Sequence, residues 1–101
     1  METINKVAVV ILNWNGVALL RRYMPSVVDN TNPDVADVIV ADNGSTDQSL
    51  TFLAVQYPQV KVIHLAENYG FAEGYNRAIA QLNYKYTLLL NSDVRVPQGW
   101  I

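Results

Sequence analysis

The chain has 101 residues, half of them hydrophobic, with no cysteine and a net charge of −2. This length suits one compact core and leaves no room for a second domain. The seven lysines and arginines are too few for a nucleic-acid partner, and the missing cysteines exclude disulfides, thiolate metal sites and cysteine nucleophiles. No apolar run approaches the roughly 18 residues of a membrane span and no signal peptide is recognisable, so we expect a soluble, cytoplasmic chain.

The first predicted elements are a buried strand and an amphipathic helix. Residues 7–12 are continuously apolar, which is typical of a strand covered on both faces. A helix follows Gly16, with a kink expected at Pro25, and ends before Pro33. Its buried face is predicted from helical spacing at Leu20, Met24, Val27 and Val28.

A second strand is predicted at residues 37–41, followed by a turn at 42–47 and another helix. Ser45 and Gln48 have the spacing of a capping box at the start of this helix. Its buried stripe is expected at Leu50, Leu53, Ala54 and Tyr57.

Two strands and a helix complete the pattern. Residues 60–65 alternate weakly and are placed at the sheet edge, residues 71–82 have the clearest helical spacing, and residues 86–90 form a fourth strand expected to be buried on both faces. This alternation predicts an α/β fold, a three-layer, open, mainly parallel sheet of four strands with right-handed crossover helices. Because Trp100 and Ile101 end the chain with nothing following to cover them, we expect residues 1–101 to be one domain that is incomplete at its C-terminus.

Each apolar run leads to a polar cluster, at residues 13–15, 42–43, 67–68 and 91–93. The carboxyl ends of parallel strands share one edge of a sheet, and open α/β sheets bind ligands outside that edge. The sequence therefore predicts a polar ligand cleft there.

Two carboxylates in these clusters have competing interpretations. Asp93 could provide the single carboxylate that a phosphate-bound Mg²⁺ needs, or it could belong to an ordinary polar turn. Asp42 could accept hydrogen bonds from a ligand, or it could be solvated while Ser45 and Asp47 cap the following helix.

The stretch at residues 68–76 places Gly70 at a loop-to-helix junction and Gly74 inside the helix. Glycine there costs about 1 kcal/mol relative to alanine, which indicates a close approach by backbone or ligand. Phosphate could bind at this helix N-terminus, with Arg77 as a contact or simply as an exposed helix residue. For His64 we favour a structural or surface role, and Trp14 could stack on a base or pack at the core rim.

Four stretches together resemble the family-2 glycosyltransferases, which have a nucleotide-sugar fold of the GT-A type. They are the residues at 9–16, 38–47, 67–76 and 88–93. The resemblance implies that the first and fourth strands are neighbours, and that the nucleotide is bound by Asn13, Asn15, Asp42, Asn68 and Asn91. In the family's Asp-x-Asp motif Asn91 replaces the first acid, as in the rhamnosyltransferase-like branch, so Asp93 carries over as the ligand of Mn²⁺ or Mg²⁺.

The implied reaction is inverting transfer of a sugar from a nucleotide-diphosphate donor to a hydroxyl of an unknown saccharide or lipid-linked acceptor. The full-length protein could then be peripheral to the membrane. The family's catalytic base lies beyond the Asp-x-Asp motif, so we assign none and expect no transfer by this chain alone. The alternatives are a nucleotidyltransferase, which the lack of basic residues at 13–16 disfavours, and a non-catalytic α/β interaction module. We also expect a homo-oligomer formed through the open edge of the fourth strand.

Overall fold

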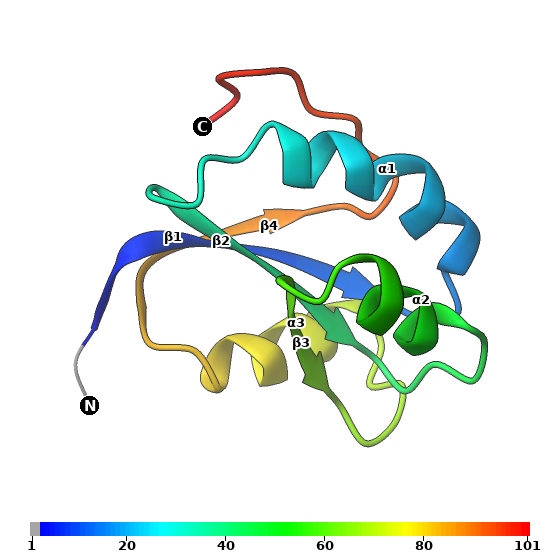
Figure 1. The fold of residues 1–101 in the computed structure, drawn as a ribbon. Coiled ribbons are helices and arrows are strands. Elements are labelled where there is room, and N and C mark those ends of the chain that lie inside the picture. The colour runs from blue at the N-terminus through cyan, green and yellow to red at the C-terminus, as the bar shows by residue number, and fades with distance from the viewer. Residues whose placement is uncertain (1–2) are drawn as a thin grey trace.

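The computed structural model describes residues 3–101 as a parallel sheet with three helices (Figure 1). The strands are β1 (Ile4–Asn13), β2 (Ala36–Asp42), β3 (Lys61–His64) and β4 (Tyr84–Leu90), and the helices are α1 (Val17–Asp29), α2 (Ser49–Gln56) and α3 (Phe71–Ala80). The strand order is β3-β2-β1-β4, and every neighbouring pair is parallel. The predicted α/β class, the edge position of β3 and the pairing of the first and fourth strands are confirmed.

The helices form two layers, with α1 and α2 over one face of the sheet and α3 over the other (Figure 1). The chain moves outward from β1 to β2 and β3 and then returns across the sheet to β4. A crossover of constant hand that reverses its direction must lie on the opposite face. This reversal explains the position of α3, and it makes the ends of β1 and β4 the switch point of the sheet.

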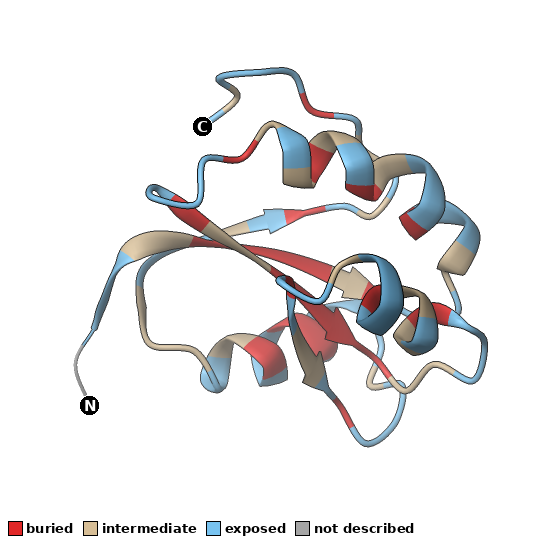
Figure 2. Ribbon diagram, in the orientation of Figure 1, coloured by how far each residue is buried: buried red, intermediate tan, exposed pale blue. Residues whose placement is uncertain are grey.

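The core is concentrated around β1 and β2, the two inner strands (Figure 2). Residues 8–11 and 39–42 are buried throughout, as the continuous apolar runs predicted. Under α1 and α2 the sheet packs against Leu20, Met24, Val27 and Leu53. Under α3 it packs against Tyr75 and Ala78.

The expectation that residues 86–90 are buried on both faces is wrong. Leu90 is buried, but Tyr86 is 59% exposed and Leu89 is 51% exposed. The reason lies in the topology, because β4 is an edge strand and α3 packs against β1 and β2 instead. An apolar run therefore did not distinguish a covered strand from an edge strand.

The predicted start of the second helix is also wrong. The helix α2 begins at Ser49 without a side-chain cap from Gln48, so Ser45 and Gln48 do not form a capping box. Asp47 Oδ1 instead accepts a hydrogen bond of 2.9 Å from the Ser49 N–H. In the predicted stripe Leu53 is buried, but Ala54 is exposed.

The other two helices follow the sequence pattern closely. The helix α1 continues through Pro25 to Asp29, and α3 ends at Ala80, two residues before the predicted end. Phe71 begins α3 but is 66% exposed, because it belongs to the first turn, at the rim of the sheet.

Residues 91–101 turn back over α1 (Figure 1), so the expectation that Trp100 is uncovered is wrong. Its Nε1 donates a 3.1 Å hydrogen bond to Thr31 Oγ1, and its ring packs on the core. Asn30 Nδ2 donates to the Val96 carbonyl at 2.8 Å, and the Val96 N–H donates to Ser26 Oγ at 3.1 Å. Ile101 is 44% exposed.

Candidate functional site

The site begins with a buried pair at the switch-point edge of the sheet. Asn13 ends β1 and Asp42 ends β2, and the two residues are partners in the strand register. Asn13 Nδ2 donates to Asp42 Oδ1 at 3.0 Å, while the Ser45 N–H donates to Asp42 Oδ2 at 2.9 Å. Asp42 is 2% exposed, so the interpretation that it is solvated is wrong.

One polar atom of Asn13 has no hydrogen-bond partner among the described residues. Its Nδ2 also reaches Ser45 Oγ at 3.2 Å, but its Oδ1 has no hydrogen-bond partner within the described chain, although the residue is 1% exposed. A Cβ at position 16 would lie 2.6 Å from this oxygen. Gly16 therefore provides the space that Asn13 occupies at the tip of β1.

Asn15 and Asp47 connect the two loops that follow β1 and β2. Asn15, with a left-handed φ of 47°, accepts hydrogen bonds at Oδ1 from the N–H groups of Thr46 at 2.7 Å and Asp47 at 3.1 Å. Asp47 Oδ2 accepts from the Val17 N–H at 3.2 Å. Desolvation raises the pKa of Asp47, but the hydrogen bonds from Ser49 and Val17 outweigh it and leave that pKa below its ordinary value. The Asp47 carboxylate thus accepts hydrogen bonds from the first residue of α1 and from the first residue of α2.

Asn43 connects these loops to the segment before α3, and sequence reasoning missed it. Its Nδ2 donates to Asn68 Oδ1 at 3.2 Å and to the Gly70 carbonyl at 3.0 Å, and its Oδ1 accepts from the Tyr69 N–H at 3.0 Å. Asn43 is 2% exposed. The available signal was its position directly after Asp42, at the end of an apolar run, because a side-chain amide that becomes buried there must find hydrogen-bond partners.

Two glycines, Gly44 and Gly74, are explained by this packing. Gly44 has a φ of 77°, and a Cβ there would lie 2.7 Å from the Glu67 carbonyl carbon. A Cβ at Gly74 would lie 2.9 Å from Asn43 Nδ2 and 3.1 Å from Leu12 Cδ1. The predicted close approach at Gly74 is confirmed, and its neighbour is the Asn43 side chain.

A pocket of about 360 Å³ opens beside this network, at the ends of β1 and β4. Its polar lining comes from Asn91, Ser92 and Asp93, and its apolar lining from Leu12, Leu19, Phe71 and Tyr75. Asn91 and Asp93 are exposed. The structure therefore brings these two predicted residues into one pocket, while it places Asn13, Asn15, Asp42 and Asn68 in the loop network.

The donor set of the pocket suits a metal that is shared with a ligand. Within residues 3–101 there is no group of three acidic, histidine or cysteine side chains that could enclose a metal. Mg²⁺ at phosphate sites takes one or two protein carboxylates, with phosphate oxygens and water completing its shell. A single exposed carboxylate at Asp93 fits that arrangement.

The other residues that the sequence marked lie outside this pocket. Arg77 stacks over the Tyr69 ring at 3.8 Å from its centroid and pairs with Glu73 at 3.3 Å, so it is an exposed helix residue. His64 is exposed at the end of β3. Trp14 is 53% exposed, so it is not packed into the core rim.

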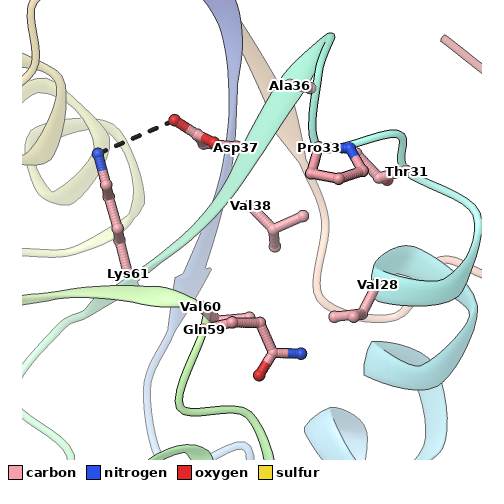
Figure 3. A pocket seen from close by; sticks show the side chains of 9 residues that line it. All are labelled: Val28, Thr31, Pro33, Ala36, Asp37, Val38, Gln59, Val60 and Lys61. Atoms are coloured by element: carbon pink, nitrogen blue, oxygen red, sulfur yellow. Dashed lines mark ion pairs between the residues drawn. The ribbon is translucent and has the colours of Figure 1, made fainter.

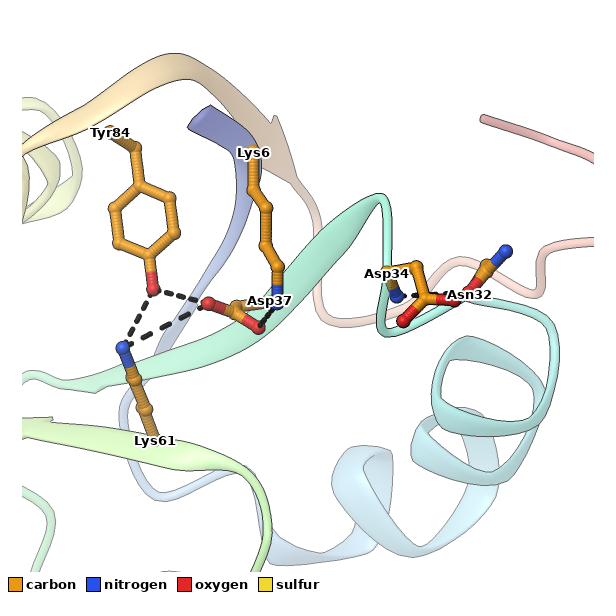
Figure 4. A network of polar contacts seen from close by, with 6 residues as sticks. All are labelled: Lys6, Asn32, Asp34, Asp37, Lys61 and Tyr84. Carbon is orange, nitrogen blue, oxygen red and sulfur yellow. Dashed lines mark hydrogen bonds and ion pairs between the residues drawn. The ribbon is translucent and has the colours of Figure 1, made fainter. Parts of the chain in front are cut away.

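A second cavity, of about 300 Å³, lies at the amino-terminal end of β2 and β3. Figure 3 shows Val28, Val38 and Val60 around it, with Lys61 extending toward Asp37. Asp37 and Lys61 are already engaged with each other and with Lys6 and Tyr84 (Figure 4). This cavity is at the end opposite to the one where open α/β sheets bind ligands, so we assign the site to the carboxyl edge.

An open parallel sheet with a polar pocket at its switch point defines an α/β ligand-binding domain. Residues 8–101 match the family model described as glycosyl transferase family 2, and the chain belongs to that family. Within residues 3–101, none of the helices is both long and apolar enough to cross a bilayer.

Curated relatives share the sequence over a part of their length. The chain is 31% identical to the uncharacterized glycosyltransferase YibD of Escherichia coli over 99 residues, which is 95% of this chain and 28% of that protein. It is 38% identical over 63 residues to an N-acetylglucosaminyl-diphospho-decaprenol L-rhamnosyltransferase of Mycobacterium tuberculosis, covering 62% of this chain and 20% of the relative. The chain thus spans less than a third of the length of these relatives.

A solved structure with a similar fold is that of S. aureus TarS 1-349. It matches with a TM-score of 0.78 and 25% identity, over 92% of this chain and 29% of that one. The same protein has been solved in complex with UDP-GlcNAc, and that structure matches at a TM-score of 0.75 and 26% identity over 87% of this chain and 26% of that one. The GT-A fold class that the sequence predicted is confirmed.

Proposed function

We propose that this chain forms the donor-binding part of an enzyme that transfers a sugar from a nucleotide diphosphate to an acceptor hydroxyl, with inversion at the anomeric carbon. The observation that carries the proposal is the pocket at the ends of β1 and β4, where Asn91 and Asp93 lie together and where Leu12, the residue before the Asp42-bonded Asn13, is also part of the lining. The membership of family 2 and the UDP-GlcNAc complex of TarS support it.

The proposed roles follow from the burial of each residue and from its hydrogen bonds. Asp42 and Asn13 are buried and shape the nucleoside end of the site by fixing the loops after β1 and β2 through their hydrogen bonds to each other and to Ser45. Asn15 and Asn68 bind the nucleotide through the loops that they hold. Asn91 contributes hydrogen bonds to ribose or sugar hydroxyls from an exposed position.

Asp93 would hold Mn²⁺ or Mg²⁺, because its carboxylate stands alone and exposed in the pocket. When bound, the metal supplies charge stabilisation to the leaving diphosphate. Asn91 and Ser92 are the other polar residues of the lining, and Leu12, Leu19, Phe71 and Tyr75 form its apolar part. We assign no catalytic base within this chain, so we propose donor binding and not transfer for it.

The acceptor and the location are proposed from the family alone. The Mycobacterium tuberculosis relative is named for a diphospho-decaprenol acceptor, so we propose a saccharide or lipid-linked acceptor for the whole enzyme. We propose that the whole enzyme is cytoplasmic and peripheral to the membrane, where it would reach an acceptor of that kind.

Isothermal titration calorimetry tests the donor site directly. We expect UDP or dTDP to bind, and we expect Mn²⁺ to strengthen that binding by at least about tenfold, or about 1.4 kcal/mol. Asp93→Ala should abolish the gain from Mn²⁺, whereas the matched variant Asp34→Ala, in an exposed turn before β2, should keep it. Absence of nucleotide binding, or an equal gain from Mn²⁺ in Asp93→Ala, would refute the proposal.

A further inference from the structure

A single hydroxyl joins the two strands whose ends form the pocket. Tyr75 lies on α3, and its Oη accepts a hydrogen bond of 3.4 Å from the Leu12 N–H of β1. The same hydroxyl donates one of 3.2 Å to the Leu90 carbonyl of β4. The register of β1 with β4 extends to the pair Ile11 and Leu90, so the hydroxyl connects the last paired residue of β4 with the β1 residue just beyond that pair.

The bridge lies directly before both candidate binding segments. Leu12 is followed by Asn13, and Leu90 is followed by the turn at residues 91–93. The pocket is lined from both strands at this point, by Leu12 of β1 and by Asn91, Ser92 and Asp93 directly after β4. The Tyr75 hydroxyl therefore lies at the position that determines how far apart the two strand ends are.

The surroundings keep the Tyr75 side chain in one place. The residue is 3% exposed, and its ring packs edge to face against Phe71, with the ring centroids 5.0 Å apart. Burial raises the pKa of the Tyr75 phenol, so the hydroxyl keeps its proton at neutral pH and can donate to Leu90. The hydroxyl is thus rigidly held and correctly protonated for a bridge between strands.

We infer that Tyr75 is a positioning residue, whose hydroxyl fixes the distance between the tip of β1 and the Asp93 turn of β4. The inference rests on the proposed function, in which the β1 side holds the nucleoside and Asp93 binds the metal on the diphosphate. A ligand that spans the two strand ends depends on their separation, whereas a ligand held by the β1 side alone does not. Tyr75 therefore supports the diphosphate part of the site selectively.

Tyr75→Phe tests this, because it removes the hydroxyl and keeps the buried ring. Without ligand, we expect faster amide hydrogen exchange at Leu12 and changed amide shifts at residues 91–93, with a modest fall in melting temperature. Tyr86→Phe is the matched control, since that ring is on β4 but exposed. It should change neither the exchange at Leu12 nor the amide shifts at residues 91–93. Unchanged exchange and shifts in Tyr75→Phe would overturn the inference, whatever the protein binds.

Calorimetry then links the bridge to the ligand. In Tyr75→Phe we expect the affinity for UDP with Mn²⁺ to fall roughly threefold to tenfold, the range of one hydrogen bond, while the affinity for uridine stays the same. An equal fall for uridine would show a general structural role and overturn the inference. If the wild-type chain binds no UDP, the proposed function fails, and the ligand-free measurements still decide whether the hydroxyl sets the strand ends.

Discussion

Tyr84 on β4 donates a 2.6 Å hydrogen bond to Asp37 on β2, although β1 lies between the two strands. Asp37 also pairs with Lys6 of β1 at 3.3 Å, and Lys61 of β3 donates to the Tyr84 hydroxyl at 2.7 Å. One residue from each strand thus meets at the amino end of the sheet (Figure 4). The two ends of the sheet consequently differ, because the charged groups at the amino end are paired with one another whereas Asn91 and Asp93 at the carboxyl end are exposed in a pocket.

Removing the Tyr84 hydroxyl should weaken this polar cluster. Tyr84→Phe deletes a hydrogen bond to a charged group. Because Asp37 is partly exposed, the contribution of this hydrogen bond to stability is reduced, and we expect a loss of about 1 kcal/mol in the free energy of unfolding. Urea denaturation measures this free energy. The exposed Tyr86→Phe serves as control, and equal stability of the two variants would contradict the prediction.

The same cluster should make stability depend on acid. Desolvation raises the pKa of Asp37, but hydrogen bonds from Tyr84 and Lys6 and the charges of Lys6 and Lys61 outweigh it and leave the pKa below its ordinary value of 3.8. A lowered folded-state pKa stabilises the protein above the unfolded value, and that contribution is lost as the pH falls through the folded one.

Asp37→Asn should therefore destabilise the chain near neutral pH and lose that disadvantage in acid. Melting temperatures of the wild type and the variant, measured from about pH 6 to about pH 2, should converge as the pH falls. A constant gap over this range would mean that the Asp37 carboxylate does not contribute through its charge.

Gly74→Ala should destabilise the protein, against the usual gain of about 1 kcal/mol for this change in a helix. The new Cβ would lie 2.9 Å from Asn43 Nδ2, and moving that amide breaks its bonds to Asn68 and Gly70. Thermal unfolding shows whether the substitution raises or lowers the stability. Hydrogen exchange at the Tyr69 amide, which donates to Asn43 Oδ1, shows whether the loop before α3 has lost its hydrogen bonds. Ala72, exposed on the same helix, offers a control as Ala72→Gly, which should show the ordinary helix cost.

The edge of β4 should associate with another copy of the chain. Tyr86 and Leu89 are exposed on this strand, and an apolar edge strand invites pairing. We expect sedimentation equilibrium to show a dimer or higher oligomer, and Leu89→Lys to shift it toward monomer. A wild-type monomer at the highest soluble concentration would argue against pairing through β4.

Much of the fold could be predicted because local signals and packing agree. The apolar runs at residues 7–12 and 37–41 became the inner strands β1 and β2, where burial on both faces demands apolar side chains. The run at 86–90 has the same composition but lies at an edge, and nothing local distinguishes the two positions. The capping box failed for a related reason, since Ser45 hydrogen-bonds to Asn13 and Asn15 across the sheet edge, 32 and 30 residues away in sequence.

The sequence by itself determined the α/β class, the polar clusters at the strand ends and the family to which they belong, because strand periodicity and turn chemistry depend on residues close together in the chain. Only the tertiary structure decided which polar groups hold one another and which face a ligand. Asn43 hydrogen-bonds to residues 25 and 27 positions away in the sequence. Tyr75 hydrogen-bonds to residues 15 and 63 positions away. Such partners meet only when the strands are in register. The pocket at Asp93 exists because that register brings the ends of β1 and β4 together.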